Sequence, residues 1–175
     1  IIFAPRNEIE LRNILYTAQL GLKNPIAIRY PRGYGKLLNW QQPVKTIKIG
    51  TGVCLQEGTN IAVLSLGTIA YNITKAIENV KDIAHYDMRF AKPLDEKLLH
   101  HICADFKFIL TLEDGVIEGG FGSAITTFVN ENNYPIKVKS LGVQDAFIEH
   151  GTVNELQKIN GIDAGAIEKF LKTIQ

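Results

Sequence analysis

The stretch Phe108-Ile109-Leu110-Thr111-Leu112 decides the fold class of this chain, because four of its five side chains are apolar. A strand with one solvated face alternates apolar and polar residues, whereas a strand with both faces covered reads as a nearly continuous apolar run. Strands of the second kind belong to parallel sheets that carry helices on both sides. The stretch therefore predicts an α/β protein with helices above and below a mostly parallel sheet.

Segments on both sides of this run alternate between strand-like and helix-like patterns. Further strands are expected at Ile49–Leu55, Ile61–Leu66, His85–Phe90 and Ile136–Leu141. Helices are expected where a capping residue precedes an apolar stripe of helical period, after Thr68, Asp95, Ser123, Thr152 and Asp163. The turn Gln56–Asn60 favours antiparallel pairing of the first two of these strands. Residues 47–175 are thus predicted to form a three-layer α/β sandwich whose mostly parallel sheet has one antiparallel edge strand.

The first 35 residues predict a partial unit of strand, helix and strand. Ile1–Ala4 is strand-like, Asn7 with Glu10 three residues later resembles a helix cap, and Pro25–Tyr30 alternates as a strand does. The two strands of such a βαβ unit are expected to be parallel and adjacent. Because few residues surround the unit, we expect it to pack on a further part of the protein or on a partner chain. Residues 36–46 have no sustained period and are predicted to be a linker.

The second strand of this unit ends in Arg29-Tyr30-Pro31-Arg32-Gly33, the main candidate binding element. Pro31 cannot donate to a strand ladder, so it ends the strand, and Gly33 relaxes the following turn. Arg32 then lies just past the end of a parallel strand, where open α/β sheets bind ligands. A guanidinium there can hold a phosphate through two parallel N–H···O bonds, so Arg32 is predicted to bind an anionic substrate. The alternative is that both arginines are surface charges paired with carboxylates.

Charge and composition exclude several classes of partner. The 175 residues carry 19 basic and 18 acidic side chains, so no broad basic field attracts nucleic acid or an acidic membrane. The apolar runs are strand-sized, which predicts no transmembrane helix, and the first residues show no signal-peptide pattern. Cys54 and Cys103 lack metal-ligand spacing and favour reduced, buried thiols in a cytoplasmic protein. Since the chain opens on strand-like Ile1 and not on methionine, we expect it to be part of a longer protein.

Two glycine-containing turns favour structural roles over chemistry. Gly67-Thr68 joins a strand to a helix N-terminus but matches neither the GxGxxG nor the Walker pattern, so a tight turn is expected. The second turn, Gly119–Gly122, follows three carboxylates, Glu113, Asp114 and Glu118. No histidine neighbours these carboxylates in sequence. Turn chemistry and a dimer contact are therefore favoured over acid–base catalysis.

The remaining charged residues are also interpreted as structural. Asp87 and Arg89 are expected to take part in buried ion pairing that anchors their strand to the next helix. No histidine has zinc-site spacing or an evident catalytic partner, so structural or surface roles are expected for His85, His100, His101 and His150.

Four groups of residues, in this order and spacing, resemble the C-terminal end of the 1-deoxy-D-xylulose-5-phosphate synthase family. They are Arg29–Gly33 (RYPRG), Asp87–Asp95 (DMRFAKPLD), Glu113–Gly115 with Gly119–Ser123 (EDG and GGFGS), and Phe147-Ile148 with His150-Gly151-Thr152. The resemblance covers nearly the whole chain. It implies that residues 1–35 end the domain that binds the pyrimidine of thiamine diphosphate, that residues 36–46 are a linker, and that residues 47–175 are a transketolase-type C-terminal domain.

The resemblance implies an enzyme that uses thiamine diphosphate and Mg²⁺ to decarboxylate pyruvate and join the two-carbon fragment to glyceraldehyde 3-phosphate. The product, 1-deoxy-D-xylulose 5-phosphate, feeds isoprenoid and thiamine synthesis. The family's catalytic, cofactor and metal residues lie upstream of Ile1, so none is assigned in this chain. The second arginine of RYPRG binds the acceptor's phosphate in this family, which implies that role for Arg32 and leaves Arg29 to structural pairing. Family members are dimers, so a homodimer is expected.

Two other functions compete with this one. Transketolase and the beta subunit of 2-oxo acid dehydrogenases share the same C-terminal domain type, although RYPRG and DMRFAKPLD favour the synthase. The third possibility is a noncatalytic module for dimerisation or regulatory ligand binding. We expect the isolated chain to be inactive, as such a module would be.

Overall fold

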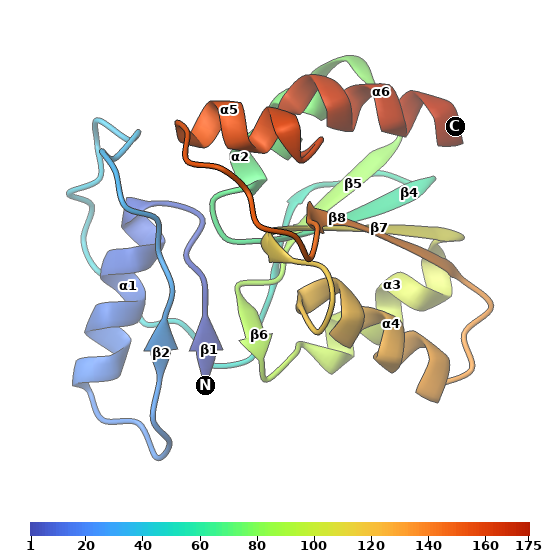
Figure 1. Cartoon of the computed structure of the whole chain (residues 1–175). Coiled ribbons are helices and arrows are strands. Elements are labelled where there is room, and N and C mark those ends of the chain that lie inside the picture. Colours follow the sequence, from blue (N-terminus) through green and yellow to red (C-terminus); the bar gives the residue numbers. More distant parts are fainter.

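The computed structural model describes all 175 residues and is built around a five-stranded sheet in the order β3-β5-β4-β7-β8 (Figure 1). The strands are β3 (Val53–Gln56), β4 (Ile61–Leu66), β5 (Ile83–Asp87), β7 (Phe108–Val116) and β8 (Lys137–Val143). Four of them are parallel, whereas β3 pairs antiparallel with β5 at the edge. The predicted mostly parallel sheet with an antiparallel edge strand is confirmed.

Helices cover both faces of this sheet and give the predicted three layers. On one face lie α3 (Glu96–Asp105) and α4 (Phe121–Glu131), and on the other α2 (Ala70–Ala76), the 3₁₀ turn Ile77–Asn79 and α6 (Ala164–Ile174). The two faces bury apolar clusters of 15 and 13 residues, so neither face of the sheet is open. All six residues of β4 are buried, as its apolar sequence requires.

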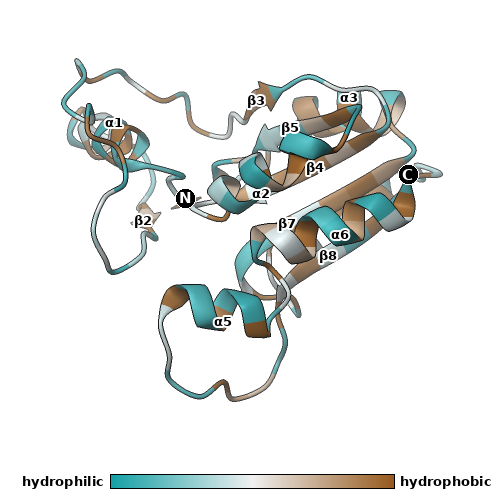
Figure 2. Cartoon of the chain, turned by 90° about the horizontal axis from the view of Figure 1, so that it is seen from above, coloured by the Kyte–Doolittle hydropathy of each residue, from teal (hydrophilic) through white to brown (hydrophobic).

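The N-terminal residues form the expected βαβ unit, which stands to one side of the five-stranded sheet (Figures 1 and 2). Its strands β1 (Ile2–Phe3) and β2 (Ala27–Ile28) are parallel and flank α1 (Glu8–Gln19). A third strand, β6 (Phe90–Lys92), comes from the C-terminal part of the chain and pairs antiparallel with β1. One edge of the N-terminal sheet is therefore covered by β6, a strand of the same chain.

The predicted antiparallel pairing of β3 with β4 is wrong, because β5 lies between them. The turn that joins the two strands crosses the start of β5. A Cβ on Gly58 would lie 2.3 Å from the carbonyl carbon of Ile83, so only glycine allows this close crossing. The turn sequence correctly indicated that the chain reverses direction, but it gave no sign that another strand, β5, would lie between β3 and β4.

The strand predicted over His85–Phe90 is two strands. The chain turns between β5 and β6 at Arg89, whose φ of 60° is in the left-handed region. The backbone N–H of Arg89 donates to Asp87 Oδ1 at 3.1 Å, which supports this turn. The break sends β6 out of the five-stranded sheet and onto β1, so it is the connection between the two sheets.

Helix caps were predicted with mixed success. Four of the predicted caps are present, at the starts of α1, α3, α6 and the short helix α5 (Val153–Ile159). In each, a side-chain oxygen of the cap residue accepts a backbone N–H of the first turn; the cap residues are Asn7, Asp95, Asp163 and Thr152. Thr68 does not cap α2, because Gly67, with φ of 82°, forms a tight turn and Ile69 takes the cap position without a side-chain bond. Ser123 does not open α4 either, since that helix begins two residues earlier.

Residues 29–52, which include the predicted linker, contain no helix or strand, yet side chains of α1 hold part of this segment in place. Arg12 donates to the carbonyl oxygens of Trp40 and Gln42 at 2.9 and 2.7 Å. Further along the helix, Asn13 Oδ1 accepts the Lys45 N–H, and Thr17 Oγ1 accepts the N–H of residue 47. Asn13 and Thr17 lie one helical turn apart and Arg12 is next to Asn13, so the segment runs along one side of α1.

Two further findings concern the cysteines and the length of the helices. Both cysteines are free; Cys103 is buried as expected, but Cys54, on the edge strand, is only half-buried. None of the helices combines the length and apolar character needed to span a bilayer.

Candidate functional site

A cavity of about 460 Å³ lies where the N-terminal unit meets the C-terminal domain. We call it the RYPRG cavity, because Tyr30, Pro31, Arg32 and Gly33 line it. Thr68, just past the end of β4, and Asp114 near the end of β7 also line it, so it lies at the carboxyl edge of both sheets. This is the place where α/β sheets bind ligands.

The two arginines of the motif lie in different surroundings. Arg32 is exposed, forms no ion pair and lines the cavity, so its five N–H donors are available to an anion. Arg29 does not line the cavity and also forms no ion pair, so the expected structural pairing is wrong. A Cβ on Gly115 would lie 3.3 Å from Arg29 Nη1, so the Arg29 side chain instead approaches the bend in β7.

Glu8 fixes the loop that carries Arg32. Its Oε1 accepts the backbone N–H of Lys36, and a Cβ on Gly35 would lie 2.5 Å from this oxygen, so the loop comes very close to the start of α1. The Lys36 ammonium lies 4.8 Å from the centre of the Tyr71 ring, a cation–π distance. The loop is thereby attached both to α1 and to α2.

Two residues that line this cavity each carry a buried polar atom with no hydrogen-bond partner: Glu8 Oε2 and the Tyr71 hydroxyl. Burial, then the Glu8 carboxylate, raises the pKa of Tyr71, so the hydroxyl keeps its proton at neutral pH. It is therefore an O–H donor with no acceptor in the protein. Buried groups of this kind are normally satisfied, and an unsatisfied one at a cavity indicates a place for a ligand or water.

Helix α5 forms another wall of the cavity through Val153, Asn154 and Gln157. The Asn72 amide of α2 donates to Gln157 Oε1 at 2.8 Å and to a backbone carbonyl just beyond α5 at 2.9 Å, which fixes α5 relative to α2. A complete capping box at the start of α5 defines where it begins. Sequence reasoning did not find these wall residues, because they come from separate segments and share no local motif.

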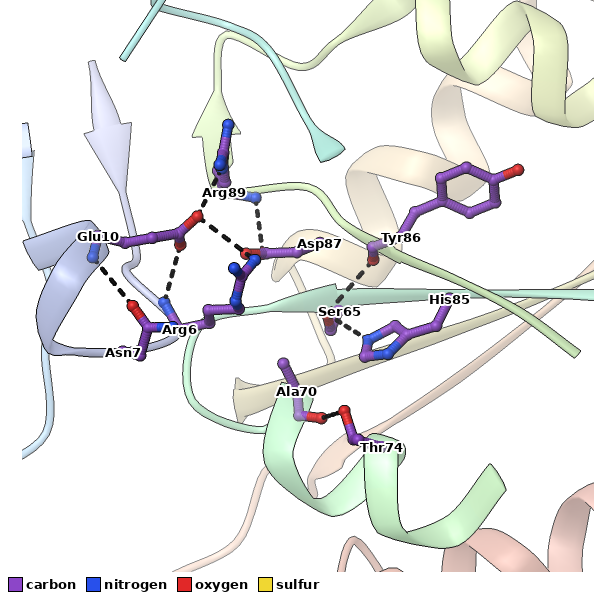
Figure 3. Close-up of polar contacts among 10 residues, drawn as sticks. All are labelled: Arg6, Asn7, Glu10, Ser65, Ala70, Thr74, His85, Tyr86, Asp87 and Arg89. Atoms are coloured by element: carbon purple, nitrogen blue, oxygen red, sulfur yellow. Dashed lines mark hydrogen bonds and ion pairs between the residues drawn. The ribbon is translucent and has the colours of Figure 1, made fainter. Parts of the chain in front are cut away.

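A network of four charged residues joins the two units beside this cavity (Figure 3). Arg89 Nε lies 2.8 Å from Glu10 Oε1, while Arg6 Nη1 lies 3.4 Å from Glu10 Oε1 and 3.4 Å from Asp87 Oδ2. Asp87 is fully buried; that burial, reinforced by the nearby Glu10 carboxylate, raises its pKa to about 8. Arg89 therefore pairs with Glu10 of α1, and the mostly protonated Asp87 contacts Arg6, so the expected buried pairing connects to α1 and not to the next helix.

Of the carboxylates around the glycine turn, Glu113 makes a structural contact. Glu113 of β7 is buried and accepts the Gly122 N–H of α4 at 2.9 Å. The strand therefore caps the first turn of α4, a role that was predicted for Ser123. Ser123 instead donates to the Ile117 carbonyl at 2.7 Å and closes the turn. Of these carboxylates only Asp114 lines the RYPRG cavity.

The histidines also take structural or surface positions. His85 is buried, with Nε2 2.9 Å from Ser65 Oγ (Figure 3). Burial, followed by the charge of Arg6, lowers the pKa of His85 to about 4. His100 Nδ1 lies 2.8 Å from the Tyr134 hydroxyl, and His101 and His150 are exposed.

No group of three or more His, Cys, Asp or Glu side chains lies close enough together to hold a metal ion. The RYPRG cavity brings the cations Arg6, Arg32 and Lys36 together with the carboxylates Glu8 and Asp114, so cations outnumber carboxylates and the exposed Arg32 is the group best placed to hold an anionic part of a substrate.

Comparison with known proteins agrees with this arrangement. The family described as transketolase, C-terminal domain, matches residues 50–167. Proteins named 1-deoxy-D-xylulose-5-phosphate synthase from Parabacteroides distasonis and Phocaeicola vulgatus are 49% and 50% identical over 98% of this chain. The chain spans 28% of the length of each of them. A solved structure described as a split gene transketolase, inactive beta4 tetramer, superposes with a TM-score of 0.83 at 25% identity, covering 98% of this chain and 56% of the other.

Proposed function

Because this chain belongs to the transketolase C-terminal domain family, we propose that it is the last part of a 1-deoxy-D-xylulose-5-phosphate synthase. Such an enzyme removes CO₂ from pyruvate and joins the remaining two carbons to glyceraldehyde 3-phosphate. Relatives with that name match from one end of the chain to the other, which favours the synthase over transketolase and 2-oxo acid dehydrogenases. The same relatives are more than three times as long, so most of the proposed enzyme lies outside this chain.

The observation that carries the proposal is the position of Arg32. It is a free guanidinium at the carboxyl edge of the sheets, in a cavity large enough for a small phosphorylated sugar. We assign to it the phosphate of glyceraldehyde 3-phosphate. The Tyr71 hydroxyl and the Lys36 ammonium, which line the same cavity, are further donors for that anion.

The proposal divides the work between this chain and the rest of the enzyme. Thiamine diphosphate supplies the electron sink for decarboxylation when it is bound. No cluster of three or more metal-ligating side chains occurs in this chain, and we assign the ligands of the cofactor and of Mg²⁺ to the remainder of the synthase. Residues 1–35 are then the end of its pyrimidine-binding domain, residues 36–46 the linker, and residues 47–175 its C-terminal domain. The proposal includes a cytoplasmic homodimer, and the free thiols fit a reducing compartment.

Arg32→Ala in the full-length synthase tests the assignment. Losing a charge-assisted phosphate contact of about 1.5 to 3 kcal/mol should raise the KM for glyceraldehyde 3-phosphate about ten- to a hundredfold and leave the KM for pyruvate nearly unchanged. Arg29→Ala is the matched control, because Arg29 belongs to the same motif and does not line the cavity. Equal effects on both substrates, or the same effect from Arg29→Ala, would contradict the assignment.

The isolated 175-residue chain tests the division of work. We expect no pyruvate decarboxylation when thiamine diphosphate and Mg²⁺ are added to it, and only weak binding of glyceraldehyde 3-phosphate, since one part of a site binds poorly. Measurable turnover would show that catalytic groups are present in this chain.

A further inference from the structure

Helix α5 and the segment before it project from the packed part of the C-terminal domain (Figure 2). We call residues 144–159 the α5 arm. None of its side chains is buried, and none belongs to one of the three apolar clusters. Every other α-helix contributes at least one residue to such a cluster. The arm is therefore the helical part of the chain with the least packing to keep it in place.

Polar contacts hold the arm at one point. Gln157 alone forms a hydrogen bond with an earlier element, where its Oε1 accepts from Asn72 of α2 at 2.8 Å. The other hydrogen bonds of the arm stay within it or run to residues 160–162, directly after it. Its charged side chains form no ion pair. A single neutral hydrogen bond is a weak restraint, so a small difference in free energy can move the arm.

The helix of the arm is well defined at both ends. A complete capping box at Thr152 starts α5, and Gly161, with φ of 66°, follows its C-terminal end. Glycine adopts this left-handed conformation without the steric cost that a side chain carries. Helix α5 is thus a short rigid rod with irregular backbone on both sides, and it can change position as one body.

Side chains from the arm and from the loop that carries Arg32 line the same cavity. Val153 of the arm is 54% exposed, and Tyr30 and Tyr34 of the loop are 61% and 103% exposed, so both leave apolar surface in water. The side-chain amides of Asn154 and Gln157 also line the cavity, and their NH₂ groups have no partner in the protein. The arm thus carries apolar surface and hydrogen-bond donors at the cavity and uses neither in this position.

We propose that α5 is a lid that closes over the RYPRG cavity when the acceptor binds. The inference rests on the proposed function, because the bound acceptor supplies contacts that favour closure. In the closed position Val153 packs against the tyrosines of the loop, and the amides of Asn154 and Gln157 donate to oxygens of the acceptor. The amide contacts need the ligand, so the ligand binds the closed form more tightly and shifts the population toward it. Closure also removes water from around the acceptor.

Distances between spin labels in the full-length synthase, measured by pulsed EPR, test whether the lid closes. With other reactive cysteines removed, Lys158→Cys labels the exposed side of α5 and Leu15→Cys labels α1; neither residue lines the cavity. Saturating glyceraldehyde 3-phosphate, without pyruvate, should shorten and narrow this distance distribution. The pair Leu15→Cys and Lys169→Cys, on α6, is the control and should not change. An unchanged distance from Leu15→Cys to Lys158→Cys would overturn the proposal.

A pair of substitutions on α5 tests the closing contact by kinetics. Val153→Asn removes apolar surface that closure buries, so the KM for glyceraldehyde 3-phosphate should rise about fivefold or more while the KM for pyruvate stays nearly unchanged. Ile159→Asn is the matched control, because Ile159 is an exposed apolar residue of the same helix that does not line the cavity. Equal effects of the two variants would show that Val153 has no closing contact.

The lid and the acceptor site fail in different ways. If Arg32→Ala leaves the KM for glyceraldehyde 3-phosphate unchanged, the acceptor site is wrongly assigned. If Arg32→Ala acts as expected and the label distance on α5 does not change, the acceptor site stands and the lid is wrong.

Discussion

The five-stranded domain and the βαβ unit are held in place by different kinds of contact. Two apolar clusters, of 15 and 13 residues, enclose the five-stranded sheet. The junction with the βαβ unit has a cluster of four, built on the edge-to-face contact of Phe3 and Phe90 at 4.8 Å, together with the network around Glu10. We infer that the sheet depends on volume and packing, whereas the junction depends on charge state and hydrogen bonds. Pairs of experiments that affect one region and spare the other test this difference.

Truncation of a core side chain should have the largest effect. Leu64 lies in the middle of β4, is fully buried and belongs to the 15-residue cluster. Leu64→Ala should lower the free energy of unfolding in urea by about 2 to 5 kcal/mol, because it removes buried methylene groups and leaves a cavity. Leu38→Ala, at a fully exposed leucine, should change it by less than about 0.5 kcal/mol. Similar losses in the two variants would show that the sheet is not the packed core described above.

Acid should weaken the sheet through His85. The folded-state pKa of about 4 lies below the ordinary value of 6.5, so the unfolded chain binds the proton more readily between these values. The stability that depends on neutral His85 is therefore present above pH 6.5 and is lost as the pH falls toward 4, by up to about 3 kcal/mol. Over the same range protonation of Asp87 adds stability, so the His85 loss is to be measured in the variant Asp87→Asn, where amide exchange in β4 and β5 should become faster as the pH falls. An NMR titration in which His85 takes up its proton near pH 6.5 would contradict the prediction.

Alkaline pH should weaken the junction through Asp87. Its folded-state pKa is raised from 3.8 to about 8, so the folded state holds a proton that the unfolded chain has lost between these values. This contribution is complete below 3.8 and disappears as the pH rises through about 8. Between pH 6.5 and 8, where His85 no longer titrates, the loss should be about 1 to 2 kcal/mol.

Asp87→Asn is the test of this second effect. Asparagine keeps the shape of the protonated acid, so the variant should lose the pH dependence above 6.5 and keep the acid response that comes from His85. Amide exchange should locate the change in α1 and β6 and not in β4. An unaltered alkaline slope in the variant would show that another group titrates there.

The distance along the chain between contacting residues decides how much of the structure the sequence could predict. Asn7, Asp95, Thr152 and Asp163 cap helices through bonds that span two or three residues, so the local pattern was sufficient. The partner of Arg89 is 79 residues away in the chain, and no local pattern contains such a contact. The position of Arg32 at the end of a strand was predictable, but the other walls of its cavity were not, because they depend on how α1, α2 and α5 come together.

The segment along α1 gives the smallest expected effect, and it tests the prediction of a linker most directly. Asn13→Ala removes the acceptor of the Lys45 N–H, which should cost about 0.5 to 1.5 kcal/mol in the local stability of residues 36–47. Amide exchange in this segment should become faster, while exchange in the five-stranded sheet stays unchanged. Asn130→Ala is the control, because Asn130 is exposed on α4 and its side chain forms no hydrogen bond within the protein. If the segment already exchanges freely in the parent chain, it is a flexible linker, and the bonds to α1 do not hold it.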